Sequence, residues 1–354
     1  MNKKLYFNED PPLKLHLQVA HITGILPQNN SSVHFLFQNY FTCCCNNAPD
    51  NFAFSFSYRE KMMSHPKLHY YQYNEYYYGK TIFDKNEYLE IIIELIDNGY
   101  YVELLGNVKH ILKLKYNSLK ESVVFGYDKT KEVFHSIGFN ARGNFQPNDI
   151  SFDDFYLAYS STHPITTGKI LNSIRENLPW LTTNKNPGEI FYYKLMDDFK
   201  CDTDRNVIIG MVEAYQNGVF PTRIMPKNGR FLKPRDKCYG VDCYNYIIDL
   251  FKSEYTKKKK ISDLRLMYGL WEHKRLIGQF IKVLQERYKK IVDFGSLTKN
   301  ANIVEGKAKQ LRFLSMDLHV NWHPDKYIEI IDGLEELREK ESYLLSELVH
   351  RLDF

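Results

Sequence analysis

The spacing of apolar residues changes near residue 165 of this 354-residue chain. Before that point, short apolar runs are separated by turn residues, and the runs 121–127 and 132–139 are joined by the turn 128–131. Two such runs joined by a short turn are typical of an antiparallel hairpin. After residue 165 the apolar residues recur mainly at helical spacing. The sequence therefore predicts an α+β fold, with an antiparallel sheet in a domain over 1–165 and a helical region over 166–354 that packs on it.

The remaining elements are assigned from the same patterns. Strands are predicted over 52–58 and 100–105, and an extended connection or strand over 108–116. Helices are predicted over 16–26, 32–45 and 83–97, the last ending at Asn98-Gly99, and Ser151 with Asp154 resembles a capping box that begins a helix. In the C-terminal part, helices are predicted near 167–177, 187–200, 205–216, 239–256, 262–291 and 325–352. The last carries opposite charges at helical spacing and could lie in a bundle or a homodimer seam.

The charge and the cysteines exclude several classes of protein. With 47 Lys+Arg against 43 Asp+Glu, the net charge of +4 does not suggest the basic stripe that nucleic acid requires, so no nucleic-acid partner is expected. Charged residues interrupt the longest apolar runs, and the N-terminus has no apolar core segment, so neither a membrane span nor a secretory signal is expected. Three of the six cysteines are adjacent, which does not suit a disulfide framework. A reducing cytoplasm is the expected compartment.

Cys43, Cys44 and Cys45 are the obvious candidates for chemistry. A nucleophilic thiolate needs a basic neighbour and often lies at a helix N-terminus. Here the three cysteines fall at the predicted end of helix 32–45, where the helix dipole disfavours a thiolate, so their expected role is packing. Contiguous spacing without a Cys-x-x-Cys pair does not suit a metal, and neither a metal nor a cofactor is predicted. Cys238 and Cys243 are likewise assigned to packing.

Three segments, taken in order, carry a resemblance to a known family. They are Glu121-Ser-Val-Val-Phe-Gly-Tyr-Asp128, then Val133-Phe-His-Ser-Ile-Gly-Phe139, then the segment 150–159. This order resembles the papain-like domain of the butirosin biosynthesis protein H type, a family of bacterial natural-product clusters that is often found beside nonribosomal peptide machinery. Two later stretches, 239–246 and 270–276, resemble helical motifs of the same family, so the resemblance covers most of the chain.

The resemblance implies a papain-like cysteine acyltransferase or peptidase-like enzyme. In the family, a cysteine near the N-terminus takes an acyl group from a carrier-protein thioester, a histidine acts as base, and an aspartate orients that histidine. In this chain the three positions fall on Leu17, Lys120 and Gly138. A leucine cannot attack a thioester, a lysine with a pKa of about 10.4 is mostly protonated unless it is desolvated, and glycine cannot hold an imidazole. The resemblance therefore implies that the triad is missing.

Two interpretations stay open at this point. In the first, the chain is a triad-lacking papain-like protein of a secondary-metabolite pathway, acting as a non-catalytic partner of a carrier protein or a biosynthetic enzyme. In the second, it is a cysteine acyltransferase with a relocated nucleophile among Cys43, Cys44 and Cys45 and with His135 or His110 as base. A sulfur within about 4 Å of a histidine ring nitrogen would favour the second interpretation. Burial of the three cysteines among aromatic residues would favour the first.

Overall fold

The chain folds into two compact units, each built from separate stretches of sequence. The computed structural model describes residues 1–46, 54–56, 68–73, 84–161, 190–219, 237–261 and 263–353. The sheet unit comprises Met1–Pro11, Leu17–Leu26 and Met63–Phe199, and the helical unit comprises Pro12–His16, Pro27–Met62 and Lys200–Phe354. The predicted domain boundary at 165 and the predicted helix 167–177 lie outside the described residues. The α+β fold class is confirmed, with a strand-rich N-terminal half and a helical C-terminal half.

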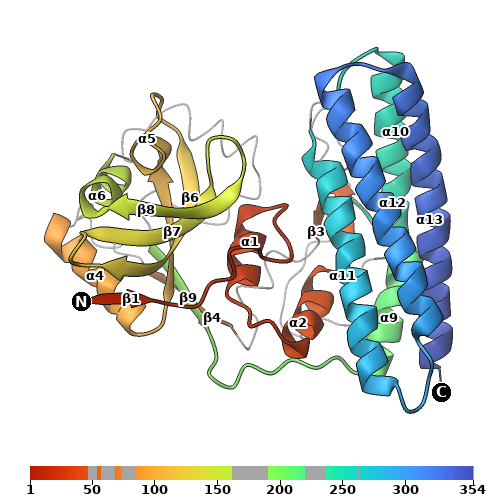
Figure 1. The fold of residues 1–354 in the computed structure, drawn as a ribbon, viewed down its shortest axis with the longest axis horizontal. Coiled ribbons are helices and arrows are strands. Elements are labelled where there is room, and N and C mark those ends of the chain that lie inside the picture. The colour runs from red at the N-terminus through yellow and green to blue at the C-terminus, as the bar shows by residue number, and fades with distance from the viewer. Residues whose placement is uncertain are drawn as a thin grey trace. The chain divides into compact units, whose positions relative to one another are not determined.

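A seven-stranded antiparallel sheet forms the centre of the sheet unit (Figure 1). Its strands follow the order β4-β9-β5-β6-β7-β8, and the short strand β1 pairs with the end of β6. The predicted hairpin is β6 and β7, which pair from Val123↔Ile137 to Asp128↔Val133. The strand bounds are β1 (Asn2–Lys4), β4 (Leu68–Tyr73), β5 (Tyr101–Asn107), β6 (Leu119–Asp128), β7 (Val133–Phe139), β8 (Phe145–Ser151) and β9 (Ile190–Leu195).

Helices cover both faces of this sheet. Helices α4 (Lys85–Asp97) and α6 (Phe152–Ser160) share one apolar core with Val102, Leu104 and other strand residues. Because Glu103 lies between these two residues, it points to the opposite face. There its Oε1 atom lies 3.9 Å from Nδ1 of His21 in α1 (Leu17–Gly24). Helix α1 therefore packs on the face opposite to α4 and α6, as Figure 1 shows.

The helical unit is a set of long helices packed side by side (Figure 1). Helix α11 packs on α12 and on α2, and α13 packs on α12, α10 and α9. A small antiparallel sheet with the order β10-β2-β3 belongs to the same unit. One face of α13 is buried within the unit, including Tyr327, Leu334, Leu344 and Leu352. The bounds are α2 (Asn30–Tyr40), β2 (Cys43–Asn46), β3 (Phe54–Phe56), α9 (Arg205–Gln216), β10 (Lys237–Tyr239), a 3-10 turn (Gly240–Asp242), α10 (Cys243–Thr256), α11 (Arg265–Tyr288), α12 (Gly295–Val320) and α13 (Pro324–Leu352).

Several predicted elements are wrong, each for a physical reason. The predicted helix 187–200 contains strand β9, which β4 and β5 hold from both sides. The predicted extended segment 108–116 begins with a short helix, α5 (Val108–Ile111), because Asn107 caps it by accepting a hydrogen bond from the backbone of Lys109. The predicted helix 32–45 ends at Tyr40, and its last residues are strand β2, which pairs with β3 and β10. At β9 and β2, pairing with strands that are distant in the sequence therefore overrode the local helical pattern.

Candidate functional site

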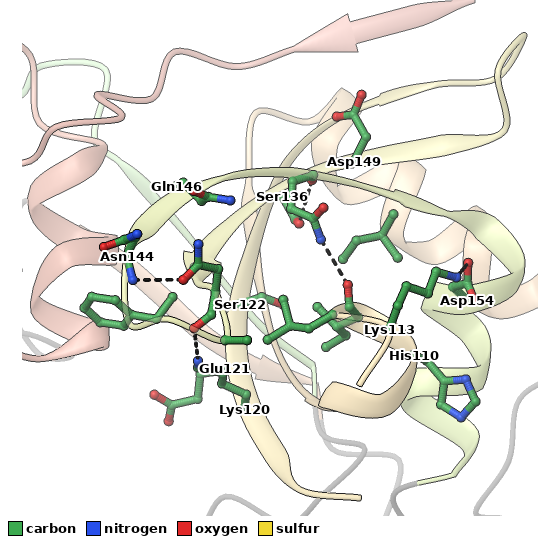
Figure 2. Close-up of a pocket in the computed structure, with 18 of the residues that line it drawn as sticks. His110, Lys113, Lys120, Glu121, Ser122, Ser136, Asn144, Gln146, Asp149 and Asp154 are labelled. Carbon is green, nitrogen blue, oxygen red and sulfur yellow. Dashed lines mark hydrogen bonds and ion pairs between the residues drawn. The ribbon is translucent and has the colours of Figure 1, made fainter. Parts of the chain in front are cut away.

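A pocket of about 570 Å³ opens on the sheet unit between strands β6, β7 and β8 and helices α5 and α6 (Figure 2). Most of the residues that line it have polar side chains. Lys120 Nζ donates to the carbonyl of Asn140 at 3.1 Å, and Asn148 Nδ2 donates to the carbonyl of Ile111 at 3.1 Å. Burial lowers the pKa of Lys120. The amide side chains at this pocket belong to Asn140, Asn144, Gln146 and Asn148.

An ion pair between Lys113 and Asp154 also lies at this pocket. Burial alone would raise the pKa of Asp154, but hydrogen bonds from Lys113 and Ser151 keep it below its usual value. His110 of α5 lines the same pocket, and desolvation lowers its pKa. The pocket therefore combines cations, three carboxylates, hydroxyls and amides, a composition that suits a polar ligand.

The structure brings together two of the three positions that the resemblance assigned to the triad. Lys120 and Gly138 both line the pocket. Lys120 lies four residues before the core residue Val124, and Gly138 four residues after the core residue Phe134, so both face the side of α4 and α6. Leu17 begins helix α1, which packs on the opposite face. The three positions therefore do not converge at one point of the sheet.

His135 forms a second arrangement of interest in the sheet unit. It lies directly opposite Asp149 in the β7–β8 pair, and its Nδ1 atom is 2.7 Å from Asp149 Oδ1. Such a pair is the base and orienter of a nucleophilic triad. However, all six cysteines belong to the stretches of the helical unit. His135 and His110 therefore have no cysteine within their own unit.

The candidate nucleophiles Cys43, Cys44 and Cys45 lie in strand β2, not at a helix end as predicted from the sequence. All three are buried, at 1%, 3% and 0% exposure. Cys43 Sγ lies 3.8 Å from the Tyr215 hydroxyl and 3.7 Å from the carbonyl of Gly240. The strand pairing also brings Cys45 beside Cys238, and Cys243 follows at the start of α10.

The cysteines at this end of the helical unit form one cluster of thiols. The Sγ atoms of Cys45, Cys238 and Cys243 all lie within 4.8 Å of one another. Hydrogen bonds from Cys243 and Cys45 lower the pKa of Cys238 to about 4. Desolvation by burial raises the pKa of Cys45 and of Cys243. Among the described residues, these are the side chains whose spacing suits a metal ion, whereas the sequence alone indicates packing residues.

A buried ionic network lies in the interior of the helical unit. Lys274 and Glu341 are fully buried, with Nζ and Oε1 2.6 Å apart. The hydroxyls of Tyr215 and Tyr244 donate to the same carboxylate at 3.1 and 2.8 Å. Lys274 Nζ also lies 2.9 Å from Nδ1 of His273, and desolvation holds the pKa of that imidazole well below its usual value. Sequence analysis missed this network, although Lys274 lies at helical spacing between the apolar residues of α11.

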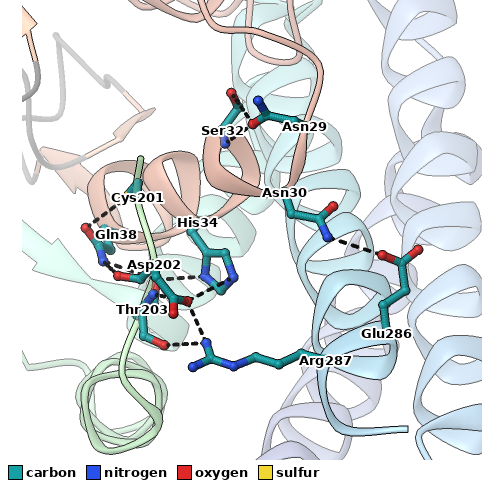
Figure 3. Close-up of polar contacts among 10 residues, drawn as sticks. All are labelled: Asn29, Asn30, Ser32, His34, Gln38, Cys201, Asp202, Thr203, Glu286 and Arg287. Carbon is teal, nitrogen blue, oxygen red and sulfur yellow. Dashed lines mark hydrogen bonds and ion pairs between the residues drawn. The ribbon is translucent and has the colours of Figure 1, made fainter. Parts of the chain in front are cut away.

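A third polar network holds the segment before α9 on helices α2 and α11 (Figure 3). His34 Nδ1 lies 3.0 Å from the hydroxyl of Thr203, and its Nε2 atom lies 3.4 Å from Asp202 Oδ1. Arg287 Nη1 donates to the same carboxylate oxygen at 2.6 Å. Desolvation lowers the pKa of His34. Each group in this network has a partner within the unit, which indicates a structural clamp.

Comparison with protein-family models and with curated proteins found no match for this chain. Among the described helices, none combines the length and the apolar character that crossing a membrane requires.

Proposed function

We propose that the chain is a non-catalytic protein with a papain-like scaffold, which binds a carrier protein or a biosynthetic enzyme of a secondary-metabolite pathway in the cytoplasm. One observation carries the proposal: the unit that holds the sheet, Lys120 and Gly138 has an open polar pocket but no cysteine. A sheet unit without a sulfur nucleophile can bind a thioester-bearing arm but cannot accept its acyl group by the family's chemistry.

The composition of the pocket supports a ligand rich in amides and hydroxyls. The exposed side-chain amides of Asn144 and Gln146 line it, and they can donate and accept hydrogen bonds. Arg142 is exposed at the same pocket, and its guanidinium suits a phosphate. A phosphopantetheine arm carries two amides, hydroxyl and phosphate groups, so a carrier protein loaded with this arm is the partner that we choose to test.

The test compares a carrier protein with and without its phosphopantetheine arm. Calorimetric titration into the full chain should show that the loaded form binds at least about tenfold more tightly, a difference of about 1.4 kcal/mol. Gln146→Trp places an indole at the pocket and should abolish this difference, because Gln146 is an exposed residue of its wall. Thr130→Trp, in the exposed β6–β7 turn, is the matched control and should keep it. Equal binding of the two forms, or none up to about 1 mM, would contradict the proposal.

A second experiment tests the alternative, a cysteine acyltransferase with its nucleophile among Cys43, Cys44 and Cys45. These sulfurs are buried, and Cys43 contacts a tyrosine hydroxyl and a backbone carbonyl. A buried thiol that a substrate cannot reach is a poor nucleophile. After incubation with an acyl-carrier thioester, intact-protein mass spectrometry should find no acyl adduct. A covalent adduct on any of these cysteines would replace the first proposal by the second.

A further inference from the structure

The thiol cluster of the helical unit draws its members from three elements. Cys45 lies on β2, Cys238 is its direct partner on β10, and Cys243 is the first residue of α10. The chain between Cys238 and Cys243 makes a tight turn through Gly240, whose φ of 57° is in the left-handed region that glycine favours. This turn brings Cys243 back over the strand, with its Sγ atom 3.9 Å from that of Cys238.

The spacing of these sulfurs matches the requirement of a tetrahedral metal ion. Four thiolates at about 2.3 Å from a zinc ion are separated by about 3.8 Å along each edge of the tetrahedron. Cys238 and Cys243 are 3.9 Å apart, and all three sulfurs lie within 4.8 Å of one another. The Cys238–Cys243 separation already fits such an edge, and the other separations would have to shorten by at most about 1 Å to bring three sulfurs around one ion. All six cysteines of the chain are free thiols, so none of the three is consumed by a disulfide.

The surroundings of the cluster suit a soft cation. Cys45 and Cys243 are 0% and 1% exposed, and Cys238 is the most accessible of the three at 8%. Cys243 lies at the first position of a 14-residue helix, whose dipole partly offsets the cost of a buried thiolate there. Cys43 lies two residues before Cys45, on the same face of β2, and its side chain is within hydrogen-bonding reach of Cys243. Cys43 is thus a further thiol beside Cys243, outside the group of three sulfurs that lie within 4.8 Å of one another.

We propose that Cys45, Cys238 and Cys243 bind one divalent soft metal ion, with zinc as the ion that the ligand set fits best. On binding, each ligand that is still a thiol gives up its proton to solvent, and the ion forms one bond to each of the three sulfurs. Such an ion would tie β2, β10 and α10 together, so its expected role is structural. This metal site lies in the helical unit, so it is independent of the function proposed for the pocket of the sheet unit.

Cobalt and zinc titration of the full reduced chain tests this site. Cobalt(II) should bind at one ion per chain and produce the thiolate-to-cobalt charge-transfer absorption of a tetrahedral sulfur site, and zinc should displace it. Cys238→Ser and Cys243→Ser should each weaken zinc binding by more than about 100-fold, since even outer-shell partners are worth 10- to 100-fold. Cys44→Ser is the matched control, because it removes a buried thiol from the opposite face of the same strand. It should leave the stoichiometry and the spectrum unchanged.

The wild-type chain alone can overturn the inference. Absence of stoichiometric cobalt binding by the reduced, folded protein would do so, whatever the variants show. A disulfide between Cys238 and Cys243 in the protein purified from reducing cytoplasm, found by mass mapping, would also overturn it. Circular dichroism separates loss of the site from loss of the fold in the variants. If Cys44→Ser loses the ion as Cys238→Ser does while both stay folded, the ion is not held by the proposed sulfurs.

Discussion

The two units differ in where their clusters of ionisable groups lie. In the sheet unit, cations, carboxylates and amides gather at an open pocket beside Lys120 and Gly138. In the helical unit, Lys274 and Glu341 are fully buried and satisfied by tyrosine hydroxyls. Perturbed groups are often taken to mark active sites, but structural ion pairs perturb their neighbours as well. Here the accessible groups are the better candidates for binding, and the buried ones for holding the helices together.

The largest effect is expected from breaking the buried ion pair. Glu341→Leu leaves the Lys274 ammonium without its carboxylate in a fully buried position. Removing one partner of a buried pair costs about 3–5 kcal/mol, because the remaining charge is uncompensated. Urea unfolding followed by tryptophan fluorescence should report a loss of this size, since Trp271 lies on the same helix as Lys274. The double variant Lys274→Met/Glu341→Leu should recover most of the loss.

An exposed pair on the same helix provides the control for this experiment. Lys340 and Glu336 are four residues apart on α13, with side chains 42% and 47% exposed. Surface pairs of this kind contribute about 0.3–0.5 kcal/mol, so Lys340→Met should hardly change the unfolding free energy. A Glu341→Leu protein as stable as Lys340→Met would show that the buried network does not hold the helices.

A smaller loss is expected where β1 meets the sheet. A Cβ atom at Gly126 would lie 2.6 Å from the carbonyl oxygen of Lys3 and 3.0 Å from Cα of Lys4. Both are backbone atoms of β1, which pairs with β6 at this point, so Gly126→Ala must displace that strand. Overpacking of this kind costs about 1–3 kcal/mol. Hydrogen exchange should show faster exchange of the Leu5 amide, which donates to the Phe125 carbonyl, and unchanged rates there would count against the description of β1.

The pH dependence of stability tests a buried carboxyl of the helical unit. Burial raises the pKa of Glu272 to about 7, although the backbone amides of Lys14 and Leu15 donate to it at 2.7 and 3.0 Å. Between its unfolded value of about 4.3 and 7, the folded chain therefore binds more protons than the unfolded chain. The contribution of the Glu272 carboxyl to the free energy of unfolding is therefore complete at the acid end of this range and is lost as the pH rises to 7.

Glu272→Gln should remove this part of the pH dependence. The difference in unfolding free energy between wild type and variant should change by up to about 1.4 kcal/mol per pH unit between pH 5 and 7. Comparing the two proteins cancels the opposite contributions of His34 and His273, whose pKa values are lowered by burial. Glu286→Gln removes an exposed carboxyl from the same helix and is the control. If the unfolding free energies of Glu272→Gln and wild type changed in parallel with pH, a raised pKa of Glu272 would be refuted.

Local sequence patterns were sufficient for elements whose own residues carry the signal. The hairpin β6–β7, helix α4 with its end at Asn98-Gly99, and helix α6 with its Ser151 cap were predicted correctly. The sequence pattern did not predict helix α12, because some of its apolar residues are exposed and its apolar residues therefore do not lie on one helix face. The exposed apolar residues include Ile303, Phe313, Met316 and Val320. Strand β8 was missed because it is a mostly polar edge strand that contains Pro147.

The candidate sites depended on pairings that no local pattern contains. Cys45 and Cys238 are almost two hundred positions apart in the sequence, and only the β2–β10 pair brings them together. The positions Lys120 and Gly138 were chosen from the resemblance, and strand alternation puts them on the pocket face. The same alternation puts helix α1, and with it Leu17, on the other face. Sequence could name these residues but could not give the face on which each would lie.

The smallest effect is expected at Gly138, and it sharpens the contrast with Gly126. A Cβ atom at Gly138 would lie 3.4 Å from the carbonyl oxygen of Glu121 and 3.7 Å from Cα and Cβ of Ser122. The added methyl group meets near-ordinary contacts, and alanine loses less backbone freedom on folding than glycine does. Gly138→Ala should therefore leave stability unchanged or raise it by up to about 1 kcal/mol, as urea unfolding will measure. A loss as large as that of Gly126→Ala would contradict the contact distances at Gly138.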